Sequence, residues 1–136
     1  MSKTTIMSAF NKHFIEFIDE VEILFPEHRG VRGGKMALIG LKKYNPRMLI
    51  QCWKDYVADK YRDDINNGDV NAFIERDYTE DCLSTGHPKM HVCLKHINDL
   101  RSRVRDMGEE NKTKSIGYII NLTKLCDIYF EIDSVK

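Results

Sequence analysis

The feature that most constrains this chain is the spacing of its large apolar residues, which recur at steps of three and four. Seven of them follow this spacing near the N-terminus, with charged residues mostly between them: Ile6, Phe10, Phe14, Phe17, Ile18, Val21 and Leu24. Because an α-helix turns once in about 3.6 residues, this spacing puts all seven on one helix face. The pattern predicts an amphipathic helix that ends before Pro26.

The same spacing predicts further helices over 36–44, 46–64, 90–107 and 111–130. The helix over 46–64 begins at an Asn-Pro pair and stops at an Asn-Asn-Gly run, which are typical start and stop signals. Asp69 is placed to cap a short helix that carries Val70, Phe73 and Ile74. No alternating strand pattern and no repeat is present. We therefore predict an all-α fold, a single helical domain over residues 1–136 that forms an irregular bundle of five to six helices.

Two stretches are predicted to be loops. The first, over 28–35, is basic and contains three glycines, a residue that favours positive φ and opposes helix. The second, over 78–88, is rich in turn formers. Both are expected to join helices without regular structure of their own.

Composition limits the classes of function. The chain has 136 residues, of which 42% are hydrophobic, and its 21 Lys and Arg balance its 21 Asp and Glu. No overall field therefore draws it onto nucleic acid or an anionic membrane. Its longest apolar runs are far below the roughly 18 residues of a transmembrane helix, so we expect no membrane span. The four cysteines lack CxxC spacing and are expected to be free, buried thiols.

The basic stretch over 28–35 is the first candidate site. It differs from a phosphate-binding loop, because Arg29 stands where the first glycine is needed and Met36 replaces the serine or threonine. However, Arg29, Arg32 and Lys35 precede the helix expected from residue 36, where free amides and the helix dipole favour anions. These three side chains are predicted to contact an anion or an acidic partner. The alternative is a solvated linker.

The second candidate is a group of soft-metal ligands: Cys82, His87, His91, Cys93 and His96. On one helix His87 and His91 would share a face, and Cys82 could reach them from the preceding loop, but Cys93 would point away. We therefore expect no bound metal and no cofactor, with Cys82, His87 and His91 as the residues to watch. No motif of an activated nucleophile or a metalloprotease is present either, so we expect no enzyme activity.

Aromatic residues are the third group of candidates. Helical spacing assigns most of them, Trp53 included, to the core. Tyr61, Tyr78 and Tyr118 fall off the apolar stripes and are predicted to be interface residues, because tyrosine is common in protein interfaces.

Three segments of the sequence carry a family resemblance: FNKHFIEFIDEVEILFP over 10–26, KKYNPRMLIQCWKDYVADKYRDDINNGDVNAFIERDY over 42–78, and MGEENKTKSIGYIINLTKL over 107–125. Together they resemble small helical proteins encoded by nucleocytoplasmic large DNA viruses of algae and protists. The resemblance rests on helix and cap patterns and brings no functional residues. It implies an infected-cell setting, either the virion or the cytoplasm or nucleus of the host cell.

These observations lead to three hypotheses. The first is a non-enzymatic viral structural or interaction protein, a minor capsid or virion component that bridges other viral or host proteins through helix surfaces. The second is a nucleic-acid-associated accessory factor, which would act through the basic stretch over 28–35 and the basic residues of the helix over 90–107. The third is a small enzyme with an unrecognised site.

Overall fold

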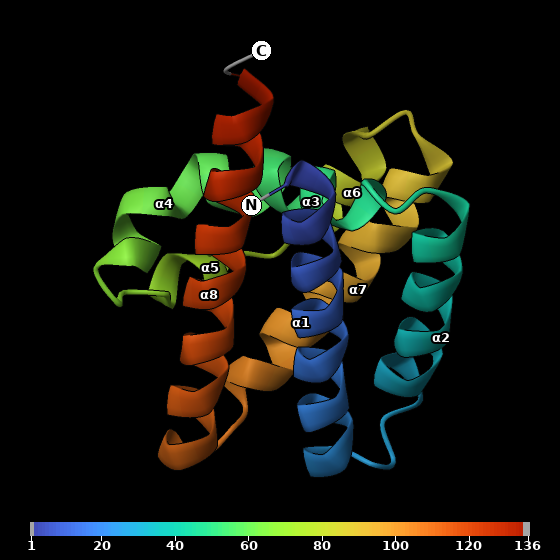
Figure 1. Cartoon of the computed structure of the whole chain (residues 1–136). Coiled ribbons are helices and arrows are strands. Elements are labelled where there is room, and N and C mark those ends of the chain that lie inside the picture. The colour runs from blue at the N-terminus through green and yellow to red at the C-terminus, as the bar shows by residue number, and fades with distance from the viewer. Residues whose placement is uncertain (1, 135–136) are drawn as a thin grey trace.

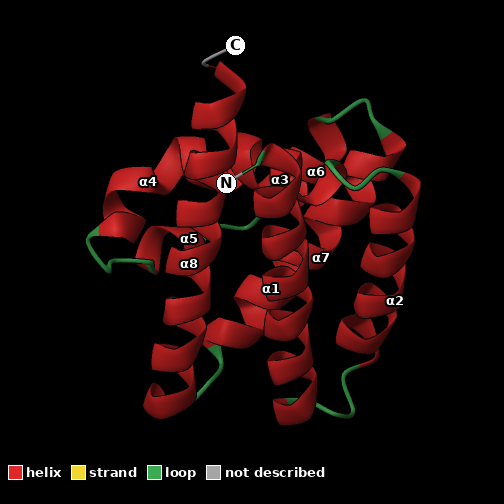
Figure 2. Ribbon diagram, in the orientation of Figure 1, coloured by secondary structure: helices red, strands yellow, loops and turns green. Residues whose placement is uncertain are grey.

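In the computed structural model, which describes residues 2–134, every regular element is a helix and no strand is found (Figure 2). The all-α prediction is confirmed. In chain order the helices are α1 (Lys3–Leu24), α2 (Arg29–Tyr44), α3 (Met48–Trp53), the π-helical η1 (Lys54–Ala58), α4 (Asp59–Asn66), α5 (Asn71–Glu75), α6 (Thr79–Ser84), α7 (Pro88–Arg105) and α8 (Glu109–Ser134).

The long helices form a bundle around α1 (Figure 1). α1 packs along α8 on one side and along α2 on the other, and α7 lies behind them in contact with both α1 and α2. α3, η1 and α4 run across one end of the bundle, while α4 and α5 lie on the flank opposite α2. Among the described residues, no helix combines the length and apolarity needed to cross a membrane.

An aromatic core fills the centre of the bundle. Phe10, Phe14 and Phe17 of α1 are buried, as the apolar spacing predicted. The Trp53 ring is buried between α1 and α8: it meets the Phe14 ring edge-on at 5.8 Å between centroids, and its indole N–H donates to Oγ1 of Thr123 at 3.1 Å. The prediction that Trp53 belongs to the core is confirmed.

The helix predicted over 46–64 is present with two irregularities. α3, η1 and α4 form a continuous helical path that contains one π turn, and its backbone leaves helical geometry again at Tyr61. Nζ of Lys54 contacts Oδ2 of Asp59 at 2.9 Å, and this five-residue separation matches the hydrogen-bond spacing of a π turn. Gly68, with φ of +83°, ends the path, and Asp69 accepts from the amide of Asn71.

The prediction of a loop over 28–35 is wrong, because α2 already begins at Arg29. Nδ1 of His28 caps this helix by accepting from the amide of Val31 at 3.2 Å. Gly34 is buried against α7: a Cβ added there would lie 2.6 Å from Nδ1 of His96. Gly34 therefore allows two helices to approach closely. Among the described residues, positive φ occurs only at Gly68.

The stretch over 78–88 is also partly helical, which corrects the second loop prediction. Oδ1 of Asp77 accepts from the amide of Thr79 at 2.9 Å and starts α6 there. Arg76 then holds Asp81 at 3.0 Å, which pins the first turn of α6 to the preceding chain. A short polar segment with such caps forms a helix without an apolar stripe long enough to reveal it.

Candidate interaction surfaces

The three basic residues predicted to contact an anion lie on α2 rather than on a loop, and they face different surroundings. Arg29 is exposed, and Arg32 donates to the carbonyl of Pro26 at 2.7 Å. Lys35 contacts Asp19 of α1 at 2.5 Å, and this hydrogen bond raises the pKa of Lys35. Because Asp19 neutralises Lys35, Arg29 and Arg32 are the two of these three residues that take part in no ion pair among residues 2–134.

One face of α2 is largely exposed, with Lys89 of α7 lying 4.8 Å over the Tyr44 ring at its end, and we call it the outer face of α2. It consists of Arg29, Arg32, Gly33, Met36, Gly40 and Tyr44. The Met36 and Tyr44 side chains are 67% and 70% exposed. A Cβ added at Gly33 or Gly40 would meet no atom within 4 Å. The outer face of α2 thus combines two exposed large side chains with two open glycines and two arginines.

Charge is divided unevenly along the chain despite its neutral total. The segment 28–54 contains seven Lys and Arg and no Asp or Glu, whereas 55–81 contains nine Asp and Glu and three Lys and Arg. α2 lies at the right of Figure 1 and α4 and α5 lie at the left, while α3 and η1 join the two segments across the end of the bundle. α2 therefore carries only basic charges, and α4 and α5 on the opposite flank carry more acidic than basic ones.

We call the negative surface the acidic flank and define it by the exposed carboxylates on α4, on α5 and between them that take part in no ion pair among the described residues: Asp63, Asp64, Asp69 and Glu75. Asp69 caps α5. Within residues 2–134, Asp63, Asp64 and Glu75 take part in no ion pair. Arg62 on the same helix is occupied by Asp59 and Asp127, at 3.1 and 2.9 Å. The acidic flank thus keeps most of its charge for external contacts.

The three tyrosines predicted as interface residues have different surroundings. Tyr78 is fully buried, lies 5.9 Å from the Phe73 ring, and cannot be a surface contact; the interface prediction is wrong for this residue. Burial raises the pKa of its hydroxyl above the usual range. Tyr118 is half-buried and stacks on Phe17 at 5.3 Å. Tyr61 is half-buried at the backbone irregularity of α4. For Tyr61 and Tyr118 an interface role stays a prediction.

The histidines and cysteines considered as metal ligands make other contacts. Nδ1 of His87 caps α7 by accepting from the amides of Lys89 and Met90, and Nδ1 of His91 lies 2.9 Å from the carbonyl oxygen of Cys82. His96 packs under Gly34. Across residues 2–134, no three His, Cys, Asp or Glu side chains are placed to share a metal ion.

All four cysteines are free and buried, as predicted. Burial raises the pKa of the Cys126 thiol to about 12 and that of Cys52 well above its ordinary value. Buried, protonated thiols are poor nucleophiles. These side chains therefore belong to the core and offer no reactive site.

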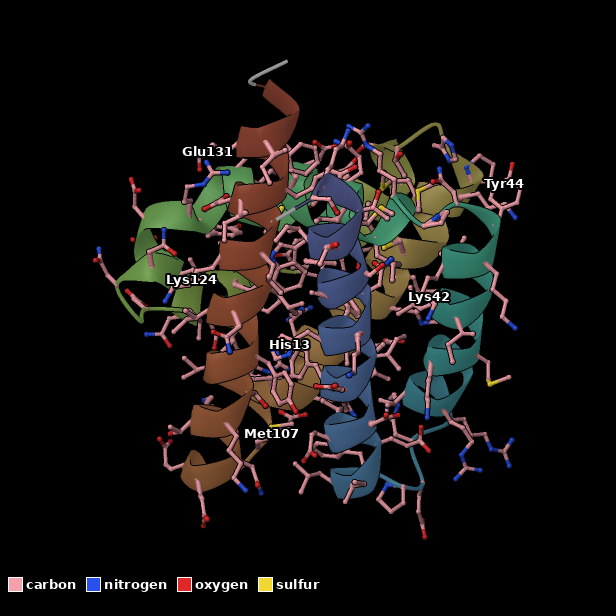
Figure 3. All side chains as sticks on the ribbon, viewed as in Figure 1. His13, Lys42, Tyr44, Met107, Lys124 and Glu131 are labelled. Atoms are coloured by element: carbon pink, nitrogen blue, oxygen red, sulfur yellow. The ribbon has the colours of Figure 1, made fainter. Side chains whose placement is uncertain are left out.

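A groove of about 400 Å³ follows the seam between α1 and α8, where His13 and Lys124 are labelled in Figure 3. It also contains Glu16 of α1, so its charge is mixed. The His13 and Tyr118 rings lie 4.7 Å apart between centroids and are tilted by 35°. No serine, threonine or cysteine lines this groove, so the histidine has no aliphatic hydroxyl or thiol to activate there.

Comparison of the chain with known protein families, with curated proteins and with solved structures found no match. The likeness to small viral helical proteins stays an expectation from the sequence. The surfaces described above therefore carry the functional argument.

Proposed function

We propose that this protein is a non-enzymatic structural or interaction protein that bridges its neighbours through two surfaces, the outer face of α2 and the acidic flank. The observation that carries the proposal is the division of charge between opposite flanks of a chain with no net charge. In the setting that the family resemblance implies, the protein is a minor capsid or virion component, and its neighbours are viral or host proteins.

The outer face of α2 has the chemistry of a protein-docking surface. Arginine and tyrosine supply many of the strongest contacts in interfaces, and methionine is enriched there. Met36 and Tyr44 offer exposed apolar area, and the open glycines let the backbone of a partner approach. An exposed glycine inside a helix costs roughly 0.5–1 kcal/mol relative to alanine. Packing within the chain explains neither Gly33 nor Gly40.

The partner must be acidic where it meets Arg29 and Arg32, because opposite charges steer and orient association. The acidic flank of a second copy provides such a surface. The two flanks are different surfaces, so contact between copies is head-to-tail and leaves one free flank at each end. Zero net charge removes the overall repulsion that keeps many proteins monomeric. We therefore take a second copy as the partner.

Sedimentation velocity at low salt and high protein concentration tests this contact. The wild type should form a concentration-dependent series of oligomers, which shortens as salt is added because exposed charges are screened over about 8–10 Å. Arg29→Ala with Arg32→Ala should remove one surface, and Asp63→Asn with Asp64→Asn the other. Each variant alone should be monomeric.

Mixing the two variants gives the sharper result. One retains its acidic flank and the other its outer face of α2, so the mixture should contain dimers and nothing larger. Two matched controls change exposed residues elsewhere, Lys95→Ala with Lys114→Ala and Glu20→Gln with Glu80→Gln, and should assemble like the wild type. A wild type that stays monomeric at every salt concentration would contradict the proposal.

The second candidate, a nucleic-acid-associated factor, is favoured by the five Lys and Arg of α2 and its lack of acids. Filter binding to duplex DNA between about 50 and 200 mM salt tests it, since each phosphate contact adds about −0.9 to the logarithmic salt slope. Replacing Arg29, Arg32 and Lys35 with alanine should then flatten the slope by up to about three such steps. Tight, salt-steep binding abolished by this triple variant would replace the bridging role.

A further inference from the structure

A second concave surface lies on the other side of α1, between α1 and the junction of α2 with α3. This hollow has a volume of about 400 Å³, and its polar lining consists of Ser8, Asn11, Lys12, Lys42 and Lys43. Figure 3 shows Lys42 on the side of α2 that faces α1. Three lysines from two helices therefore meet at one hollow that is separate from the outer face of α2.

The charge of this hollow is not balanced. No Asp or Glu lines it, and none of its three lysines takes part in an ion pair among the described residues. Other lysines of the bundle have acidic partners: Lys35 contacts Asp19, and Lys54 contacts Asp59. Three ammonium groups that share a concave surface without a counter-charge favour an anion.

Asn11 adds a second requirement, a hydrogen-bond donor on the ligand. This residue is only 4% exposed, and its Nδ2 donates to the carbonyl of Pro46 at 2.9 Å. That bond fixes the orientation of the amide, yet its Oδ1 is buried without a hydrogen-bond donor. Buried acceptors are nearly always satisfied in native proteins. Because Asn11 lines the hollow, a ligand that carries a hydroxyl or amino donor would supply the missing bond once a small shift of the side chains around this oxygen uncovers it.

A purely structural explanation covers part of this arrangement. Lys42 and Lys43 lie in the last turn of α2, where positive side chains stabilise the helix dipole. That role requires neither Lys12 from another helix nor a buried oxygen without a donor. The helix dipole therefore does not explain why these groups meet at one hollow.

We propose that this hollow binds a small phosphorylated ligand that also carries hydroxyl groups, with the lysines at its phosphates and Asn11 at a hydroxyl. Phosphorylated polyols and nucleotides share this chemistry. Inorganic polyphosphate has the phosphate charges without the hydroxyl groups of a polyol or a sugar. The proposal is independent of the bridging role, because none of these residues belongs to the outer face of α2 or to the acidic flank.

Isothermal titration calorimetry of the full chain with inositol trisphosphate, ATP and inorganic tripolyphosphate tests the proposal. We expect one site per chain for inositol trisphosphate and weaker binding of tripolyphosphate. Tighter binding of ATP would support the same site with a nucleotide as ligand. Equal binding of all three probes would show a response to charge alone and would overturn the proposal, as would the absence of a single saturable site.

Variants locate the site. Lys42→Gln with Lys43→Gln should raise the Kd for inositol trisphosphate about tenfold or more, because two ammonium–phosphate contacts are lost. Lys95→Gln with Lys114→Gln removes the same charge from exposed positions outside the hollow and should leave the Kd within about twofold. The control pair should keep the urea midpoint of the wild type, and Lys42→Gln with Lys43→Gln should lower it only slightly, because two charges are lost from the end of α2. Equal weakening by both pairs would refute the assignment to this hollow.

Discussion

Two adjacent glycines of α2 allow a matched pair of substitutions whose effects on stability should have opposite signs. A Cβ added at Gly33 meets no atom within 4 Å, whereas at Gly34 it lies 2.6 Å from Nδ1 and 3.1 Å from Cγ of His96. The His96 side chain is only 13% exposed, so its ring has little room to move aside. The same added methyl group is thus accommodated at one position and overpacked at the next.

The magnitudes follow from these environments. Replacing glycine with alanine inside a helix stabilises a protein by roughly 0.5–1 kcal/mol, and we expect this gain in full for Gly33→Ala. At Gly34 an overpacking cost of about 1–3 kcal/mol opposes it. Gly34→Ala should therefore lower the free energy of unfolding by about 0.5–2 kcal/mol.

Urea unfolding followed by far-ultraviolet circular dichroism measures both changes. The double variant Gly34→Ala with His96→Ala should lose less stability than the sum of its single changes, because removing the ring relieves the clash. Equal stabilisation by Gly33→Ala and Gly34→Ala would refute the close approach of α2 to α7. Destabilisation at Gly33 would refute the helix itself and restore the loop that the glycines predicted.

Three further predictions concern the core and the helix ends. Trp53→Ala should lower the free energy of unfolding by about 3–5 kcal/mol, because the ring is fully buried; a loss below about 1 kcal/mol in urea titration would contradict its packing. His28→Ala should cost about 1 kcal/mol of thermal stability and His28→Asn much less, since asparagine also caps helices; equal losses would show that the ring does not cap α2. The pKa of the Cys126 thiol is raised to about 12 in the folded protein. The protonated thiol therefore contributes fully to stability below the ordinary thiol pKa of about 8.5, and this contribution shrinks as the pH rises toward the folded-state pKa. When the pH is raised from neutral to above the ordinary thiol pKa, the urea midpoint should fall more for the wild type than for Cys126→Ala. Equal falls for the two proteins would exclude this linkage.

The long helices could be predicted from sequence because each buries one apolar stripe. In α1 the predicted positions from Ile6 to Val21 are all buried, and only Leu24 at the helix end is exposed. In the same way, Gly68 and Asp69 mark the boundary between α4 and α5 through backbone chemistry that is local to the chain. Where local periodicity and caps decide the structure, sequence is sufficient.

Tyr78 shows where that reasoning fails. It lies between α5 and α6, where the chain is too irregular for a periodic pattern to assign a face. Its burial comes from tertiary contacts: the Phe73 ring packs against it, and its amide donates to Oδ1 of Asn98 on α7 at 2.9 Å. No spacing within the sequence encodes a contact with a helix twenty residues away. Spacing in the sequence therefore predicts a surface position for a side chain that tertiary contacts bury.

The glycines of α2 failed as loop signals for a related reason. Glycine permits positive φ, and it also permits close contact between backbones, but the sequence does not distinguish these uses. Gly34 serves the second use against His96, and Gly33 and Gly40 serve neither within the chain. The cost of placing glycines at exposed helix positions is the physical reason to look for a partner on this face.

Net charge illustrates the limit of composition. Equal numbers of acidic and basic residues give the molecule no net charge, but this total conceals one mostly basic and one mostly acidic segment. The fold decides the consequence. Had α4 packed against α2, the two segments would have neutralised each other inside one molecule. Because α2 and the acidic flank lie on opposite sides of the bundle, the charges that have no partner within the chain, such as those of Arg29, Asp63 and Asp64, do not neutralise each other, and this is the physical reason to expect contacts between neighbours.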